Sequence, residues 1–163
     1  MLTAIAGART EVLLATYIFD DDQTGRRFVS ALADARQRGV RVLVLLDDLG
    51  RRTSFPGILP RVLGEKLEVA RFMPVQLLPP RISVNLRNHR KLLVVDQRLG
   101  FAGGMNIGDR QLSHSAEARR AADVHFAIQG PIVADLRRLF LSDWRHCGGI
   151  DPGVSPAAPG TFG

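Results

Sequence analysis

The sequence has very little cysteine, few aromatic residues and no long apolar run. Cys147 is the only cysteine among 163 residues, so no disulfide can form within the chain and nothing indicates an oxidising compartment. Aromatic residues make up 6% of the chain and do not alternate with its basic residues. The stacking platform typical of proteins that bind single-stranded nucleic acid is therefore not visible.

The sequence also lacks a candidate spanning helix and a candidate signal peptide. No stretch approaches the roughly 18 consecutive apolar residues of a spanning helix. Arg9 and Glu11 interrupt the N-terminal segment too early for the apolar core of a signal peptide. We therefore expect that any membrane contact is peripheral or comes from sequence beyond this chain.

What the chain does contain is an ordinary globular composition with a surplus of positive charge. Hydrophobic residues make up 45% and charged residues 23%, which is enough for one domain with a real core. The 22 Lys and Arg exceed the 16 Asp and Glu, giving a net charge of +6. This balance favours phospholipid headgroups, nucleic acid or phosphate esters as partners, although a soluble surface without a polyanionic partner fits it equally well.

Apolar runs and helical periodicity alternate along the chain. Buried strands are expected at Glu11–Phe19 and Arg41–Leu46, with a helix from about Gln23 to Gly39 between them. This order indicates a right-handed parallel crossover. The further expected elements are the end of a helix in Met1–Ala8, a short helix near Pro60, strands at Leu67–Phe72 and Asp123–Gln129, irregular chain over Pro74–Asn88, and a final helix from Pro131 with an apolar stripe of Ile132, Leu136, Leu139, Phe140 and Trp144. The predicted fold is α/β, with a mixed, largely parallel sheet flanked by helices on both faces.

The composition changes after His146. Residues 147–163, CGGIDPGVSPAAPGTFG, are rich in Gly and Pro, which predicts a linker or frayed tail rather than a packed element. Residues 1–146 are then one domain.

The stretch from Asn88 to Asn106 carries the chemistry. His89 and Lys91 precede the apolar run Leu92–Val95, which reads as a buried strand. Residues two apart on a strand project from the same face, so an imidazole lies beside a cation. This pair suits attack on phosphorus, because the ring is a nucleophile and the ammonium can hold a phosphate oxygen.

Other residues complete the pattern. Asp96 opens the turn between two predicted strands, where an aspartate is common for purely structural reasons. Gly103 and Gly104 allow a backbone to approach a ligand closely, and Asn106 adds an amide donor. A single His before a strand would carry little weight, but here all the pieces occur together.

This pattern resembles the signature H-x-K-x4-D-x6-G-[SG]-x-N of the phospholipase D superfamily. The segments HRKLLVVD, FAGGMNIGDR, YIFDDDQTG and GPIVADLRRLFLSDW are similar to those of bacterial cardiolipin synthases and their relatives. The resemblance extends to about Trp144 and covers one signature, whereas most such relatives carry two. The chain therefore resembles an N-terminal half, and autonomous activity is in question.

The resemblance implies a two-step displacement through a phosphohistidine, with neither metal nor other cofactor. His89 is then the nucleophile, while Lys91, Asn106, Gly103 and Gly104 contact phosphate. Asp96 is a catalytic-motif residue that either contacts substrate or holds the hairpin together. A second imidazole must protonate the leaving alcohol, and it would come from a second phospholipase D-like half or from a homodimer partner.

A carboxylate before a later strand orients the nucleophilic His in this family. Asp123 fits that position, and Glu117 is the nearby competitor. His125 shares a face with Asp123 and is more typical of a packed histidine. Tyr17 and Asp21 are weaker candidates for shaping a headgroup pocket.

Three functions remain open. The first is a phosphatidyltransferase or phospholipase half acting on anionic phospholipid, cytoplasmic and peripheral to the inner membrane. The second is a homodimeric, metal-independent phosphodiesterase or endonuclease acting on nucleic acid. The third is an inactive fragment that binds anionic lipid.

Overall fold

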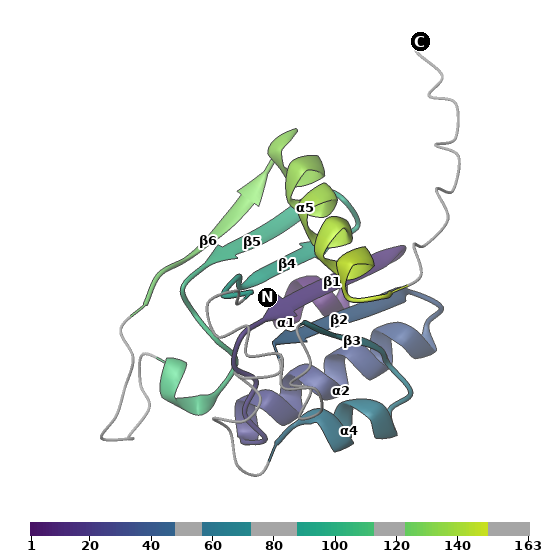
Figure 1. Ribbon diagram of the computed structural model, residues 1–163, viewed down its shortest axis with the longest axis vertical. Helices are drawn as coiled ribbons and strands as arrows, with labels where there is room; N and C mark the ends of the chain where they lie inside the picture. The colour runs from purple at the N-terminus through teal and green to yellow at the C-terminus, as the bar shows by residue number, and fades with distance from the viewer. Residues whose placement is uncertain (48–56, 73–87, 113–122, 150–163) are drawn as a thin grey trace, which may run out of the picture.

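A computed structural model describes residues 1–47, 57–72, 88–112 and 123–149 (Figure 1). Within these ranges one sheet of six strands is flanked by helices. The strands are β1 Glu11–Thr16, β2 Arg41–Asp47, β3 Glu68–Phe72, β4 Leu92–Val95, β5 Leu99–Gly103 and β6 His125–Gln129. The helices are α1 Leu2–Ala6, α2 Gln23–Gln37, α4 Leu59–Gly64 and α5 Ile132–His146, with a 3₁₀ turn η1 at Asp109–Gln111.

The sheet is mixed, as predicted, in the order β3-β2-β1-β4-β5-β6. Strands β1, β2 and β3 pair in parallel, and α2 makes the predicted crossover between β1 and β2. Strands β4, β5 and β6 pair antiparallel, as does β1 with β4. Parallel pairing is therefore confined to one side of the sheet, which is less parallel overall than the sequence indicated.

The core consists of two layers, one on each face of the sheet. On one face, α1, α2 and α4 pack on alternate residues such as Val12, Leu14 and Val44. On the other face, α5 packs on the residues between them, such as Leu13 and Leu43. Figure 1 shows α5 crossing the sheet on one side, with α2 on the other. Strands β1 and β4 are consequently buried on both faces.

The predicted helices and strands are present where the structure describes them, with one correction in α5. Ile132 and Leu139 belong to the predicted apolar stripe, but they are 50% and 38% exposed. The buried stripe instead runs through Val133, Phe140 and Trp144, with Leu141 beside it. The sheet covers the side of α5 that carries Val133, Phe140 and Trp144, so the flank with Ile132 and Leu139 is left exposed. Most of the predicted irregular segment Pro74–Asn88 and of the Gly/Pro tail lies outside the described residues.

This topology gathers several strand ends at one edge of the sheet, called here the site edge. Strands β1, β2 and β5 end there, whereas β4 and β6 begin there, as their pairing registers show. Ligands in sheets of this kind bind at the carboxyl ends of parallel strands. Among the described helices, none has the length and apolar character needed to cross a bilayer.

Candidate active site

The imidazole of His89 and the ammonium of Lys91 meet at the site edge, as the sequence predicted. Lys91 Nζ lies 2.9 Å from His89 Nδ1 and donates to the His89 carbonyl oxygen, also at 2.9 Å. The ring of Tyr17 lies 4.5 Å from the His89 ring, centroid to centroid, and 5.2 Å from Lys91 Nζ. An exposed imidazole thus rests between a buried cation and an aromatic ring.

Burial sets the electrostatics of Lys91. Its residue is only 5% exposed, and desolvation lowers the pKa of the ammonium, while the charges of Asp123 and Asp47 oppose that shift. Burial disfavours a charged group, so the ammonium gains when an anionic phosphate arrives beside it. Lys91 is accordingly placed to interact strongly with a phosphate oxygen in a poorly solvated position.

Carboxylates bind the residues on both sides of His89. The N–H of Asn88 donates to Asp47 Oδ2 at 3.1 Å, and the Asn88 side-chain amide donates to Asp143 Oδ2 at 2.8 Å. Arg90 Nη1 lies 2.6 Å from the same Asp143 oxygen. Since Asp47 ends β2 and Asp143 lies on α5, two distant elements fix the chain that presents His89.

Asn88 and Asp143 were missed by the sequence reasoning. An Asn directly before the motif and an Asp in a helix with an apolar stripe are individually ordinary. The signal that could have singled out Asn88 is its place beside His89, and only the fold brings Asp143 to it.

The two motif glycines lie where the end of β5 passes close to the chain that leads into β6. A Cβ on Gly103 would lie 2.2 Å from the carbonyl oxygen of Val124, and one on Gly104 would lie 1.9 Å from Asp123 Oδ1. The N–H of Gly104 donates to the Val124 carbonyl at 2.9 Å. In this structure the glycines make room for β6 and for the Asp123 carboxylate.

Asp123 lies at the site edge, near Lys91, as its effect on the Lys91 pKa indicates. Its carboxylate accepts the N–H of Val124 at 2.9 Å. Among the described contacts, no hydrogen bond joins it to His89. The orienting role of Asp123 therefore remains a prediction.

Asn106 is held by its side-chain oxygen, which accepts the N–H of Ile18 at 3.1 Å. A backbone N–H can only donate, so the amide oxygen must face Ile18 and the amide nitrogen faces away from it. The donor end of Asn106 thereby remains available for a phosphate oxygen.

Asp96 lies at the opposite edge of the sheet, at the far end of β4. Its carboxylate accepts the N–H groups of Arg9, Thr10 and Glu11, together with the Thr10 hydroxyl. Asp96 and Gln97 have positive φ values of 51° and 55°, which fits a tight hairpin turn. Of the two roles left open by the sequence, these contacts favour holding the hairpin on β1.

The remaining histidines and the cysteine show no catalytic contacts in the described part of the chain. The His125 ring is half-buried on β6, and burial lowers its pKa. His146 stacks loosely against Phe72 at 5.7 Å. Burial raises the pKa of Cys147 to about 11, so its thiol is unreactive at neutral pH. His114 and Glu117 lie outside the described residues.

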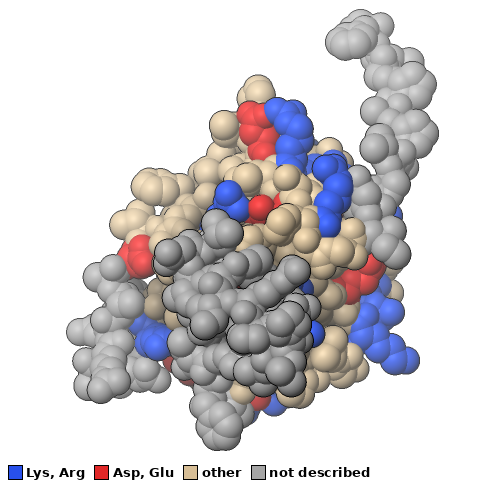
Figure 2. Space-filling view, viewed as in Figure 1, with Lys and Arg blue, Asp and Glu red and all other residues tan. Residues whose placement is uncertain are grey.

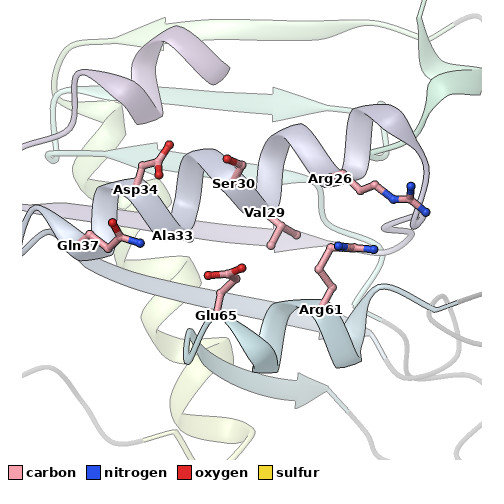
Figure 3. A pocket seen from close by; sticks show the side chains of 8 residues that line it. All are labelled: Arg26, Val29, Ser30, Ala33, Asp34, Gln37, Arg61 and Glu65. Atoms are coloured by element: carbon pink, nitrogen blue, oxygen red, sulfur yellow. The ribbon is translucent and has the colours of Figure 1, made fainter.

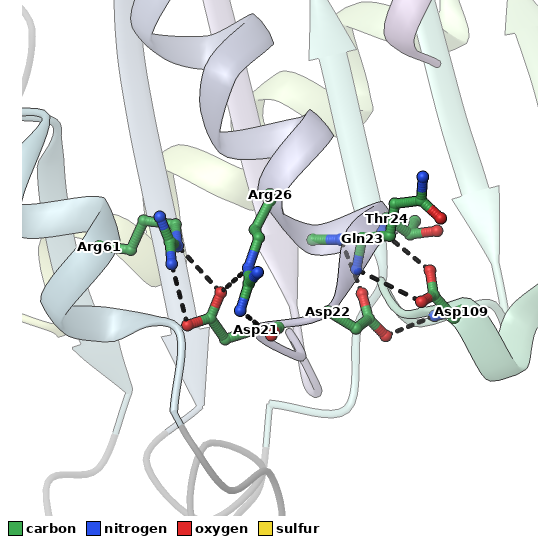
Figure 4. Close-up of polar contacts among 8 residues, drawn as sticks. Asp21, Asp22, Gln23, Thr24, Arg26, Arg61 and Asp109 are labelled. Carbon is green, nitrogen blue, oxygen red and sulfur yellow. Dashed lines mark hydrogen bonds and ion pairs between the residues drawn. The ribbon is translucent and has the colours of Figure 1, made fainter.

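Asp21 bridges two helices. Its carboxylate lies 2.9 Å from both Arg26 Nε on α2 and Arg61 Nε on α4, as Figure 4 shows. The hydrogen bonds of Arg61 and Arg26 lower the pKa of this carboxyl. Asp21 therefore joins α2 to α4 and, unlike Tyr17, does not approach His89.

The described part of the surface also carries a hollow and scattered charges (Figure 2). A hollow of about 260 Å³ lies between α2 and α4, with residues such as Ser30, Asp34 and Glu65 along it (Figure 3). No motif residue lines this hollow. Figure 2 shows Lys and Arg side chains interspersed with Asp and Glu on the viewed face, so the positive charge is not gathered there into one patch.

Comparison with known proteins identifies a family and several relatives. The family described as "Cardiolipin synthase, PLD-like domain" matches residues 1–144. The major cardiolipin synthase ClsA of Bacillus subtilis is 34% identical over 148 residues, covering 90% of this chain and 30% of that protein. Cardiolipin synthase A of Pseudomonas fluorescens is 36% identical over 141 residues, covering 86% and 29%. The chain thus spans about 30% of the length of these relatives.

The fold is also that of solved structures. The phospholipase D family member Nuc from Salmonella typhimurium superposes with a TM-score of 0.65 at 20% identity, over 88% of this chain and 84% of Nuc. NucT from Helicobacter pylori gives a TM-score of 0.68 at 16% identity, over 91% and 87%. Because the family model matches residues 1–144, the chain belongs to the phospholipase D-like domain family of cardiolipin synthases.

Proposed function

We propose that the chain is a cardiolipin-synthase-like catalytic half that transfers a phosphatidyl group through a phosphohistidine. The observation that carries this proposal is the contact between His89 and the buried ammonium of Lys91, 2.9 Å apart at the site edge. The family match over residues 1–144 supports the lipid substrate class. Residues 1–146 form the catalytic half, and 147–163 a linker or tail.

In the first step, a nitrogen of His89 attacks the phosphorus of a phospholipid phosphodiester. The bond to the leaving alcohol breaks, and a second imidazole gives that alcohol its proton. Lys91 and the amide nitrogen of Asn106 hold the non-bridging oxygens, on which negative charge develops. Asp123 receives the other ring N–H of His89 and fixes its orientation.

In the second step, an acceptor alcohol or water attacks the phosphohistidine. The second imidazole removes the proton of the acceptor, the phosphorus–nitrogen bond breaks, and His89 returns to its starting state. The protein groups alone balance both steps, so the proposed reaction needs neither a divalent metal nor another cofactor.

The second imidazole is proposed to come from a second phospholipase D-like unit. An uncovered apolar corner beside the site edge supports this partner. Val124 and Phe126, on the same face of β6 as the α5-packed Ile128, are 61% and 63% exposed. Leu139, on the flank of α5 that also carries Asp143, is 38% exposed as well.

A second candidate is a homodimeric phosphodiesterase acting on nucleic acid. The net charge of +6 favours this reading, and a two-fold dimer would supply both imidazoles from one sequence. A third candidate is an inactive unit that binds anionic lipid. In the lipid-directed readings the chain contacts the inner membrane peripherally from the cytoplasm.

The experiment incubates the chain with phosphatidylglycerol vesicles and, in parallel, with plasmid DNA, both in excess EDTA. We expect lipid turnover whose specific rate rises with protein concentration as two units associate. Cleavage of plasmid alone would favour the second candidate, and vesicle binding without turnover the third.

Two further outcomes would contradict parts of the mechanism. A verified monomer with a concentration-independent specific rate would exclude the need for a second unit. If turnover were lost on chelation and restored by zinc or magnesium, the proposal that the reaction needs no metal would be wrong.

A further inference from the structure

Where β4 begins, the strands on either side of it meet directly. In the sheet β4 separates β1 from β5. Beyond Lys91 their continuations pair with each other, because Asp20 N donates to the Ile107 carbonyl at 2.9 Å and Ile107 N donates to the Ile18 carbonyl at 3.1 Å. The segments that carry Tyr17 and Asn106 thus close together beside His89.

A pair of carboxylates ties this junction to the amino end of α2. Asp109 accepts the N–H of Thr24 at 2.8 Å and that of Gln23 at 3.3 Å. Asp22 accepts the N–H of Gly25 at 2.8 Å and that of Asp109 at 2.5 Å. Figure 4 shows both carboxylates pointing at the first turn of α2. The first N–H groups of a helix have no partner within it, so the two segments cap α2 together.

The junction is closely packed as well as hydrogen-bonded. A Cβ on Gly108 would lie 2.5 Å from Asp20 Oδ2, and one on Gly25 would lie 1.8 Å from the Asp20 carbonyl oxygen. Arg110 Nη2 lies 3.2 Å from Asp20 Oδ2. Hydrogen bonding by the Thr24 hydroxyl is the main cause that lowers the pKa of Asp109, so the group is an ionised acceptor at neutral pH.

We propose that Asp109 is a positioning residue that fixes Asn106 through this junction, called here the α2 clasp. Asp109 lies three residues after Asn106, and its hydrogen bonds attach this part of the chain to α2. With that chain fixed, the Asn106 oxygen remains on the Ile18 N–H and its nitrogen is directed to the substrate phosphate. The phosphate-binding part of this role rests on the proposed function, whereas the clasp itself does not.

The first test is amide hydrogen exchange on the full chain with Asp109→Ala and Asp109→Asn. In Asp109→Ala, exchange should accelerate about tenfold at Ile18 as well as at Thr24, since each amide loses its restraint. Asp34→Asn, on the exposed side of α2, is the matched control and should change neither amide. Acceleration at Thr24 alone would overturn the proposal, because Asp109 would then be a helix cap only. Asp109→Asn keeps one acceptor and provides a folded variant if Asp109→Ala does not fold.

The second test is a double-mutant cycle on turnover of short-chain phosphatidylglycerol. Asp109→Ala should lower kcat about 10–100-fold with little change in KM, the size expected of a misplaced binding group. In an Asn106→Ala background the further loss should be under about twofold, because Asp109 acts through Asn106. An equal loss in both backgrounds would overturn the proposal. No turnover by the unmodified chain would count against the proposed function, and hydrogen exchange would still decide the clasp.

Discussion

The two ends of β4 carry residues of one signature, yet their surroundings differ sharply. At the site edge, the His89 imidazole is exposed and the Lys91 ammonium is buried against it. At the other end, roughly 17 Å from Lys91 at the usual rise of a strand, the Asp96 carboxylate is surrounded by backbone N–H groups. One end keeps polar groups available, whereas the other has its donors and acceptors paired.

The difference shows that residues of one contiguous motif can have separate roles, structural at one end and ligand-binding at the other. A carboxylate that accepts several N–H groups is strongly stabilised as an anion and has little capacity left for a ligand. A buried ammonium facing an imidazole gains from an added anion. Spacing in the sequence therefore placed Asp96 in the same motif as His89, but strand geometry placed it at the opposite edge.

The largest expected effect comes from removing the nucleophile. His89→Ala should abolish phosphodiester turnover and any acid-labile phosphoryl adduct, because no other described histidine lies beside a lysine at the site edge. The melting temperature should stay close to that of the unmodified chain, since the ring is exposed. A rapid quench in alkaline denaturant, followed by mass spectrometry without acidification, measures the adduct in both the variant and the unmodified chain. Full activity in His89→Ala would contradict the assignment of catalysis to the His89 end of β4.

The next effect is at Lys91. Lys91→Met keeps the buried volume but removes the ammonium, so we expect a loss of roughly 10²–10³ in kcat, typical of one lost transition-state donor. Steady-state kinetics on phosphatidylglycerol measures this loss, and urea unfolding should show that the fold is retained. A rate within about twofold of the unmodified chain would mean that another group holds the phosphate oxygens.

A change at the opposite edge of the sheet should lower stability and leave turnover nearly unchanged. Asp96→Ala leaves the N–H groups of Arg9, Thr10 and Glu11 without their acceptor, which should cost about 1–3 kcal/mol of unfolding free energy. Turnover per folded molecule should change by less than about threefold, since Asp96 is remote from His89. Urea denaturation and kinetics on the same preparation check the two parts. Lost turnover with unchanged stability would make Asp96 part of the chemistry.

Local patterns in the sequence predicted much of this molecule. The apolar runs of β1, β2 and β4 and the helical spacing of α2 are local signals, so those elements were expected where they occur. The contact between His89 and Lys91 followed from strand alternation. The contacts of Asp143 and Asp109 did not, because they join residues more than fifty positions apart. Likewise, the exposed flank of α5 depends on its angle across the sheet, which no local pattern specifies.

The smallest expected effect is the pH dependence of the Asp96 end. Burial raises the pKa of this carboxyl, but the hydrogen bonds from Thr10, Glu11 and Arg9 together outweigh it and lower the pKa below the ordinary 3.8. A depressed pKa means that the unfolded state binds the proton more readily than the folded state. The stabilisation is therefore present in full well above pH 3.8 and is lost as the pH falls through the folded-state pKa.

Asp96→Asn cannot ionise, so the difference in unfolding free energy between it and the unmodified chain should be constant near neutrality. That difference should narrow below about pH 4, which urea titrations between pH 7 and pH 3 would measure. Asp34→Asn, which removes an exposed carboxylate from α2, serves as the control for the loss of one negative charge. A gap between Asp96→Asn and the unmodified chain that widens on acidification would mean that the neutral acid is the better partner for these N–H groups, and the contrast between the two ends of β4 would lose its electrostatic basis.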